Sequence, residues 1–196
     1  MSLEIWSTIA SIGTFVVIAA TAVAALLQLR HMRSSNQIAA ITAMSETMAS
    51  DEFLRAYHFV TEEVPKLLAD PAGRSKLGAK VWSPEIEPVR VVGNFFERMG
   101  VFVKLRIIDR SVVCDLFDGV VFKAWKQLEP VVLIRRKVSS PGTWTSFEYL
   151  AVLSERSLLA NSDGYYPPGV RRMKCDEKSI ATAEAFERDR ADIPQP

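Results

Sequence analysis

Residues 5–29 read IWSTIASIGTFVVIAATAVAALLQL and contain no charged side chain. A helix rises about 1.5 Å per residue and the hydrocarbon core of a bilayer is about 30 Å thick, so about 20 apolar residues span it. The stretch therefore predicts a transmembrane helix surrounded by membrane lipid. A cleavable signal peptide would have a basic start and a shorter apolar run, and a core helix rarely extends this far without charge.

The residues at the two ends of this run predict its orientation. Arg30 and Arg33 follow the run, whereas Glu4 is the only charged side chain before it. Trp6 lies near the outer end, where an amphipathic ring suits the headgroup layer. Because cations concentrate on the cytoplasmic side, we expect the N-terminus outside and the remaining chain in the cytoplasm.

Composition places the rest of the chain among ordinary globular domains. The net charge is +1 and 24% of the residues are charged, so no strong field recruits nucleic acid. The two cysteines are too few for a disulfide framework and suit a reducing compartment. We expect four parts: an external N-terminus at 1–4, the span at 5–29, a cytoplasmic helical domain at 30–160, and a loop with a charged, loosely attached helix at 161–196.

The fold class follows from the spacing of apolar residues. Neither Gly nor Pro occurs between Leu29 and Met48, so the span is expected to continue as one helix into the cytoplasm. No stretch shows the alternation of a strand, and VVLI at 131–134 alone cannot make a sheet. We predict an all-α protein in which one N-terminal transmembrane helix continues into a small helical bundle.

An apolar stripe follows the span, at Ile38, Ile41, Met44 and Met48. It is either a dimer seam or a face covered by later helices of the same chain. The second interpretation is favoured because sustained heptads are absent.

Later helices are predicted from caps and helical periodicity. Their expected ranges are 51–68, 89–105, a helix capped by Asp109 that ends near Glu129-Pro130, 145–159 and 176–190. The main loop is expected at 70–88, since prolines and glycines recur there.

Two finer patterns lie within these helices. Thr145 and Glu148 have the spacing of a capping box. Gly93 and Gly100 are seven residues apart, which predicts close approach of a neighbouring helix on their side.

A candidate polar cluster comprises Glu97, Trp125, Arg135, Arg136 and Glu148. Glu97 lies among large apolar residues and would need a partner if buried, for which an arginine is the candidate. With Trp125 it could line a pocket between helices for a small ligand. The equally open alternative is a partly solvated glutamate on a helix face.

The basic run Arg135-Arg136-Lys137 has two interpretations. It is either the favourable end of a helix or a contact with anionic lipid. The histidines His31 and His58 lack ligands at metal spacing, and no glycine-rich phosphate loop occurs. We therefore expect no metal, no cofactor and no nucleic-acid partner, and we assign no catalytic residue.

The chain resembles a bacterial family defined by a domain of unknown function, the family numbered 4760. The resemblance covers about residues 85–155 and is carried by Phe95-Phe96-Glu97, Gly100, Val103, Ile108-Asp109, the run from Trp125 to Pro130, Arg135-Arg136 and the run from Phe147 to Leu150. Members combine an N-terminal membrane segment with a short helical domain. The resemblance implies a protein of the bacterial inner membrane and carries over no activity or ligand.

Together these observations favour a non-enzymatic interaction or scaffold module at the bacterial inner membrane. Its cytoplasmic domain is expected to bind a protein partner or a second copy of the chain. The alternatives are a sensor or enzyme with a pocket near Glu97 and Trp125, and an anionic-lipid sensor that acts through Arg135, Arg136 and Lys137.

Overall fold

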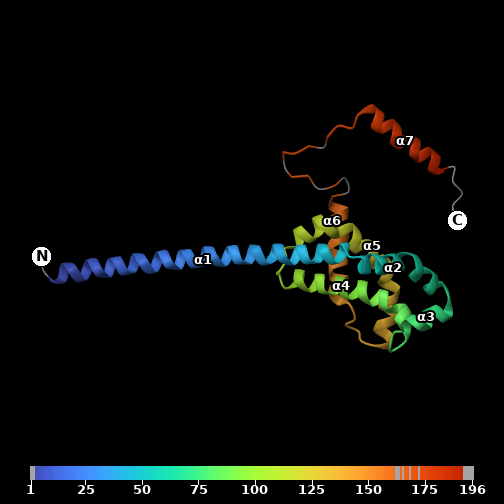
Figure 1. The fold of residues 1–196 in the computed structure, drawn as a ribbon, viewed down its shortest axis with the longest axis horizontal. Coiled ribbons are helices and arrows are strands. Elements are labelled where there is room, and N and C mark those ends of the chain that lie inside the picture. The colour runs from blue at the N-terminus through green and yellow to red at the C-terminus, as the bar shows by residue number, and fades with distance from the viewer. Residues whose placement is uncertain (1–2, 162–163, 165, 168, 172, 192–196) are drawn as a thin grey trace. The chain divides into compact units, whose positions relative to one another are not determined.

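The computed structural model describes residues 3–161, 164, 166–167, 169–171 and 173–191 (Figure 1). The regular elements within these residues are seven α-helices and one short 3-10 helix, η1, so the all-α prediction is confirmed. The chain divides into two units, Met1–Ala160 and Asn161–Pro196. The first unit contains α1 to α6, and the second contains α7.

Helix α1, Leu3–Ala49, is continuous from the apolar run into the following polar residues. Among the described residues, it is the one helix that is long and apolar enough to cross a membrane. No residue of its most apolar 18-residue segment is buried. The hydroxyls of Ser11 and Thr21 donate to the carbonyls of Ser7 and Val17, at 2.9 and 2.8 Å. An exposed apolar helix of this kind is typical of a membrane anchor or a signal sequence.

The C-terminal part of α1 joins the core of the first unit. Met44 is buried, and Ile41 and Met48 are partly buried against that core. The interpretation of the stripe as a face covered by the same chain is therefore confirmed for these three residues. Ile38 remains 63% exposed.

Helix α2, Asp51–Ala69, begins as the sequence predicts and continues through Pro65. Ser50 caps it, since its hydroxyl accepts from the backbone N–H of Phe53 at 3.2 Å. Its buried face, with Phe53, Val60 and Val64, packs mainly against α4 and α5.

The segment 70–88 is not a continuous loop, so that prediction was wrong. It contains α3, Pro71–Gly78, and η1, Pro84–Ile86. The Asp70 carboxylate accepts from the backbone N–H of Gly73 at 2.9 Å, and Pro71 occupies the first helical position, where it needs no hydrogen-bond partner. These residues start a short helix, and its fully buried Leu77 attaches it to the core.

The core is completed by α4, Glu87–Lys104, α5, Arg110–Val138, and α6, Thr145–Ala160. The apolar residues of α4 that follow the helical period are all buried: Val89, Val92, Phe96, Met99 and Val103. Helix α6 packs extensively against both α4 and α5, which contact each other much less. These three helices therefore form an arrangement in which α6 is the shared packing partner of α4 and α5.

Helix α5 does not end at Glu129-Pro130, as the sequence predicted, but extends to Val138. Proline lacks an N–H donor and removes one hydrogen bond from a helix interior. Leu128, Val131 and Val132 are nevertheless buried on both sides of Pro130. Burial of this apolar face offsets the lost hydrogen bond and keeps the helix continuous.

The second unit contains helix α7, Glu177–Ala191. Asp176 caps it, because its carboxylate accepts from the backbone N–H of Ser179 at 2.7 Å. The apolar residues Ile180 and Phe186 are exposed at 46% and 63%.

Candidate functional site

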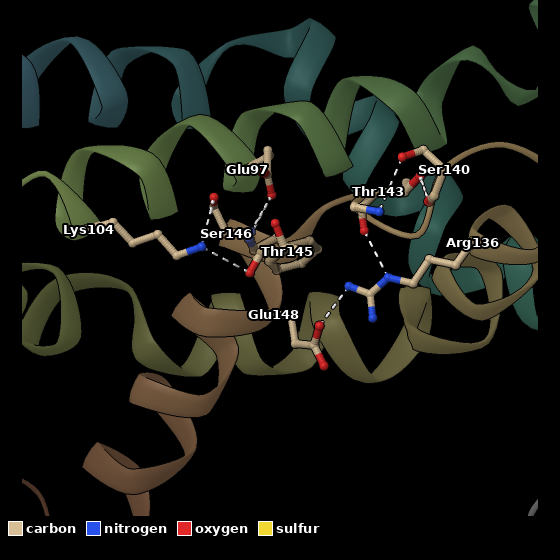
Figure 2. A network of polar contacts seen from close by, with 10 residues as sticks. Glu97, Lys104, Arg136, Ser140, Thr143, Thr145, Ser146 and Glu148 are labelled. Atoms are coloured by element: carbon tan, nitrogen blue, oxygen red, sulfur yellow. Dashed lines mark hydrogen bonds and ion pairs between the residues drawn. The ribbon is translucent and has the colours of Figure 1, made fainter.

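A polar network forms where α6 begins between α4 and α5 (Figure 2). At its centre is Glu97 of α4, which is partly buried. Its Oε2 atom accepts from the backbone N–H groups of Ser146 at 2.9 Å and Phe147 at 2.8 Å. These N–H groups belong to the first turn of α6, where they lack partners within the helix and where the helix dipole favours a negative charge. The partner of Glu97 is thus a helix N-terminus rather than an arginine.

The capping box predicted at Thr145 and Glu148 is not formed. The Glu148 carboxylate instead accepts from Arg136 Nη2 at 2.6 Å. Arg136 Nε also donates to the Thr143 carbonyl at 3.1 Å (Figure 2). Because the Arg136 side chain is only 21% exposed, these two bonds tie the last turn of α5 to the α5–α6 connection and to α6.

Lys104, at the end of α4, completes the network on its other side. Its Nζ atom lies 3.3 Å from Ser146 Oγ and 3.5 Å from the Thr145 carbonyl (Figure 2). It also lies 5.4 Å from the ring centroid of Tyr149. The start of α6 is therefore held by charged side chains from both neighbouring helices.

The two glycines of α4 allow this close approach, as the sequence predicted. A Cβ atom at Gly93 would lie 2.1 Å from the ring of Trp144, and one at Gly100 would lie 2.1 Å from the Ser146 carbonyl oxygen. Trp144 is buried and donates from Nε1 to Asn94 Oδ1 at 3.0 Å. The neighbour is thus the first turn of α6 together with the tryptophan that precedes it.

Arg135 lies in a separate contact. Its guanidinium donates to the Ala79 carbonyl and stacks over the Trp82 ring at 4.8 Å from the centroid. Trp82 Nε1 donates to the Leu77 carbonyl at 2.9 Å. Arg135 therefore connects α5 to the segment that follows α3.

Trp125 belongs to the core and not to a polar site. It is 8% exposed and meets the Phe147 ring edge-on at a centroid distance of 5.1 Å. Of the five residues in the predicted cluster, the structure brings together Glu97, Arg136 and Glu148 at the start of α6. It places Arg135 and Trp125 elsewhere.

The residues predicted to flank the membrane lie on α1. Trp6 is 60% exposed and Arg30 is exposed. Arg33 donates from Nη2 to the Arg106 carbonyl at 3.2 Å, a contact with the α4–α5 turn that the sequence did not predict. The side chain of Glu4 lies outside the described residues.

An open cavity of about 560 Å³ lies beside Glu97, between α4 and the junction of α1 with α2. Polar and charged residues dominate its lining: Thr47, Ser50, Glu52, Arg90, Asn94, Glu97 and Arg98. A smaller cavity of about 190 Å³ continues along α1 and shares Thr47, Phe95 and Arg98 with the first. We call these two cavities together the α1–α4 groove.

The charges of this groove are partly paired. Arg90 donates from Nε to Glu87 at 2.9 Å, and the hydrogen bond lowers the pKa of the Glu87 carboxyl. Asn94 and Arg98 were not among the site residues predicted from the sequence. Their separation of four residues along α4 was the available signal, because it places them on one face of a helix, but which face α1 leaves open is set by tertiary packing. Among the described side chains, no three His, Cys, Asp or Glu residues are placed to hold a metal ion.

Comparison with known protein families gives a match over most of the chain. A family described as a domain of unknown function (DUF4760) matches residues 15–153, which is more than half of the chain. The matched range begins within the apolar part of α1 and ends within α6. No curated protein and no solved structure matches the chain.

Proposed function

The chain belongs to the DUF4760 family, and we propose that it is a single-pass, membrane-anchored interaction module. In this proposal α1 crosses the bacterial inner membrane with its N-terminus outside, and the helical domain in the cytoplasm binds a protein partner or a second copy of the chain.

The exposed apolar part of α1 carries the proposal. From Ile5 to Leu29, the large apolar side chains that the structure describes are 47–71% exposed, although the helix is continuous with residues that join the core. Exposing such a surface to water is unfavourable, whereas lipid accommodates it. A helix satisfies its own backbone hydrogen bonds, which is the condition for crossing the hydrocarbon region.

Native cysteines allow a direct test of the proposed topology. Cys175 is exposed and lies in the part of the chain proposed to be cytoplasmic. A membrane-impermeant maleimide should label Cys175 only after spheroplasts are permeabilised. In a matched variant that carries Cys114→Ser, Cys175→Ser and Ser2→Cys, labelling should occur in intact spheroplasts. The reverse pattern would contradict the orientation, and alkaline extraction of the full chain would contradict the anchor.

The α1–α4 groove supports the interaction role. Met44, Phe53 and Phe95 are the buried apolar residues of its lining. Glu52, Arg90 and Arg98 add charged side chains to it. An apolar floor with a charged rim resembles the anatomy of protein interfaces. The groove also lies on the part of α1 that follows the span, so a partner bound there would be held at the membrane.

A photocrosslinking amino acid at Arg98 in the full chain tests this role in native membranes. The expected product is an adduct with a protein, and an adduct of twice the chain mass identifies a second copy. The same crosslinker at Lys123, an exposed residue of α5, serves as the matched control. If position 98 gives no more adduct than position 123, the groove is not the interaction site.

A small-ligand site is the second candidate, because the larger cavity of the groove falls within the usual range of about 300–1,000 Å³ for ligand pockets. The sequence suggested a ligand pocket lined by Glu97 and Trp125. That hypothesis is weakened because Trp125 is buried and Glu97 caps α6. Similarly, Arg135 and Arg136 are occupied within the domain, which favours their interpretation as residues of a helix end.

A further inference from the structure

Four cations from three parts of the chain line one open cavity of about 710 Å³. We call it the basic pocket; it comprises Arg33, Lys104, Arg106, Asp109, Arg110 and Tyr149, with Gln37 and apolar residues completing the lining. Within the described residues, none of the four cations forms an ion pair. The single acid, Asp109, accepts from the backbone N–H and the hydroxyl of Ser111, both at 2.8 Å. The basic pocket therefore carries a net positive charge.

Two of these cations occupy locally unfavourable positions, one at a helix N-terminus and one in a left-handed backbone conformation. Arg110 is the first residue of α5, where the helix dipole repels a positive charge. Arg106 has a φ of 55°, a left-handed conformation usually adopted by glycine. It follows the end of α4 in a Schellman motif: the N–H of Arg106 bonds to the Val103 carbonyl and that of Ile107 to the Phe102 carbonyl, at 3.0 and 2.9 Å. Departures from local preference that gather at one place are expected at functional sites.

The basic pocket is attached to α1 next to the end of the apolar run. Arg33 Nη2 donates to the Arg106 carbonyl at 3.2 Å and so holds the α4–α5 turn against α1 (Figure 1). Arg33 follows Leu29 by four residues, which is about 6 Å along a helix. The polar layer of a bilayer is about 5–8 Å deep on each side. In an anchored chain, the basic pocket would therefore lie at the level of the lipid headgroups.

The α4–α5 turn also presents apolar side chains beside its cation. Leu105 and Ile107 flank Arg106 and are 66% and 43% exposed. Adjacent apolar and basic side chains suit the boundary between acyl chains and headgroups, where both kinds of contact are satisfied.

We propose that the basic pocket binds the phosphate group of an anionic phospholipid in the leaflet next to the helical domain. This proposal rests on the proposed membrane anchor. The guanidinium groups of Arg106 and Arg110 supply charged donors to the phosphate, and Leu105 and Ile107 contact the upper acyl chains. The bound lipid would fix the helical domain against the membrane surface by contacts that are independent of the α1–α4 groove.

The test uses the delipidated full chain in a neutral detergent and measures affinity for short-chain lipids. Dioctanoyl phosphatidylglycerol should bind at least about tenfold more tightly than dioctanoyl phosphatidylcholine, and added salt should weaken its binding. The double variant Arg106→Gly/Arg110→Gln should weaken phosphatidylglycerol binding by about 25-fold, at about fivefold for each cation lost. Inorganic phosphate forms a separate arm and should bind much more weakly than phosphatidylglycerol.

Matched variants separate a site from a general effect of charge. Arg55→Gln/Lys123→Gln removes two exposed cations elsewhere in the first unit and should change affinity less than twofold. Arg106→Lys keeps the charge and should keep most of the affinity. Equal binding of the two lipids, or equal loss in the matched double variant, would overturn the proposal. Inorganic phosphate binding as tight as phosphatidylglycerol would also overturn it, by identifying a site for free anions.

Membrane fractionation distinguishes this proposal from the proposed function. The variant Arg106→Gly/Arg110→Gln should remain in the membrane after alkaline extraction, because α1 is unchanged. Weak lipid discrimination in a protein that stays in the membrane would reject the basic pocket alone. Loss of the unaltered chain from the membrane would reject the anchor.

Discussion

Glu97 and Ser146 are joined across two helices: the Glu97 carboxylate of α4 accepts the backbone N–H of Ser146 at 2.9 Å. The same oxygen accepts from Phe147, so α6 receives its N-terminal cap from another helix. The two residues are 49 positions apart in the sequence. Capping and tertiary packing are therefore coupled at this point.

The first prediction concerns this cap. Glu97→Ala should reduce the free energy of unfolding by about 1–3 kcal/mol, because two partly buried N–H groups lose their acceptor. Glu97→Gln keeps an acceptor oxygen and should cost less. Denaturant unfolding of the full chain in detergent measures both, with Glu62→Ala on exposed α2 surface as the control. A loss no larger than that of Glu62→Ala would contradict the capping role.

The second prediction compares three glycines. Gly93→Ala and Gly100→Ala should each destabilise by about 1–3 kcal/mol, because the added methyl group meets Trp144 or the Ser146 carbonyl. Gly119→Ala in α5 should instead stabilise by up to about 1 kcal/mol, since open space surrounds that position and alanine favours a helix. Thermal unfolding of the three variants checks the order. Equal effects at all three positions would show that α6 does not approach α4 so closely.

The third prediction separates stability from lipid binding at Arg106. Arg106→Gly should increase the free energy of unfolding by about 0.5–1 kcal/mol in detergent without anionic lipid, because glycine adopts the left-handed conformation at lower cost. Arg106→Ala removes the same charge but keeps Cβ, so it should not give this gain. Comparable stability of the two variants would argue against backbone strain at this position.

The fourth prediction concerns pH and the cap of α5. Hydrogen bonds from the Ser111 backbone and hydroxyl lower the pKa of the Asp109 carboxyl. A carboxyl whose pKa is lowered by folding stabilises the folded state at pH values above the ordinary pKa of aspartate. That contribution is lost as the pH falls below about 4. The unaltered chain should therefore lose stability relative to Asp109→Asn as the pH is lowered from 5 to about 2.5. Parallel curves of stability against pH for the unaltered chain and Asp109→Asn would refute the prediction.

The fifth prediction distinguishes the two cysteines. Burial raises the pKa of the Cys114 thiol, and the nearby carboxylates of Asp118 and Asp115 raise it further. Cys175 is exposed. Because the thiolate is the reactive form, Cys175 should react with maleimide at pH 7 at least about tenfold faster than Cys114. Mass spectrometry of Cys114→Ser and Cys175→Ser variants measures each rate separately, and similar rates would be inconsistent with a shielded Cys114.

The elements predictable from the sequence are those decided by local signals. The absence of Gly and Pro between Leu29 and Met48 indicates that α1 continues past the apolar run, and the spacing of Val89, Phe96 and Val103 predicts the buried face of α4. The predicted end of α5 at Pro130 was wrong. Proline locally disfavours a helix interior, but burial of Val131 and Val132 keeps α5 intact. The segment 70–88 was misinterpreted because its prolines start short helices as readily as they break long ones.

The candidate site was predictable only in part. Glu97, Arg136 and Glu148 were predicted as members of a candidate polar cluster, but their actual partners depend on how α6 enters between α4 and α5. The basic pocket was not identified, because Arg33 and Arg106 are 73 residues apart. Helical periodicity carries no information on contacts at that separation.

In the proposed anchored chain, the unbroken α1 would make the helical domain responsive to the bilayer itself. From Leu29 to Met44 the helix extends about 22 Å beyond the apolar run, without a glycine or proline at which it could hinge. A thinner membrane tilts a span that is too long for it, and a stiff helix transmits that tilt as a lever. In that arrangement the load would fall on Met44, where α1 joins the core, and membrane thickness would become a mechanical input to the folded domain.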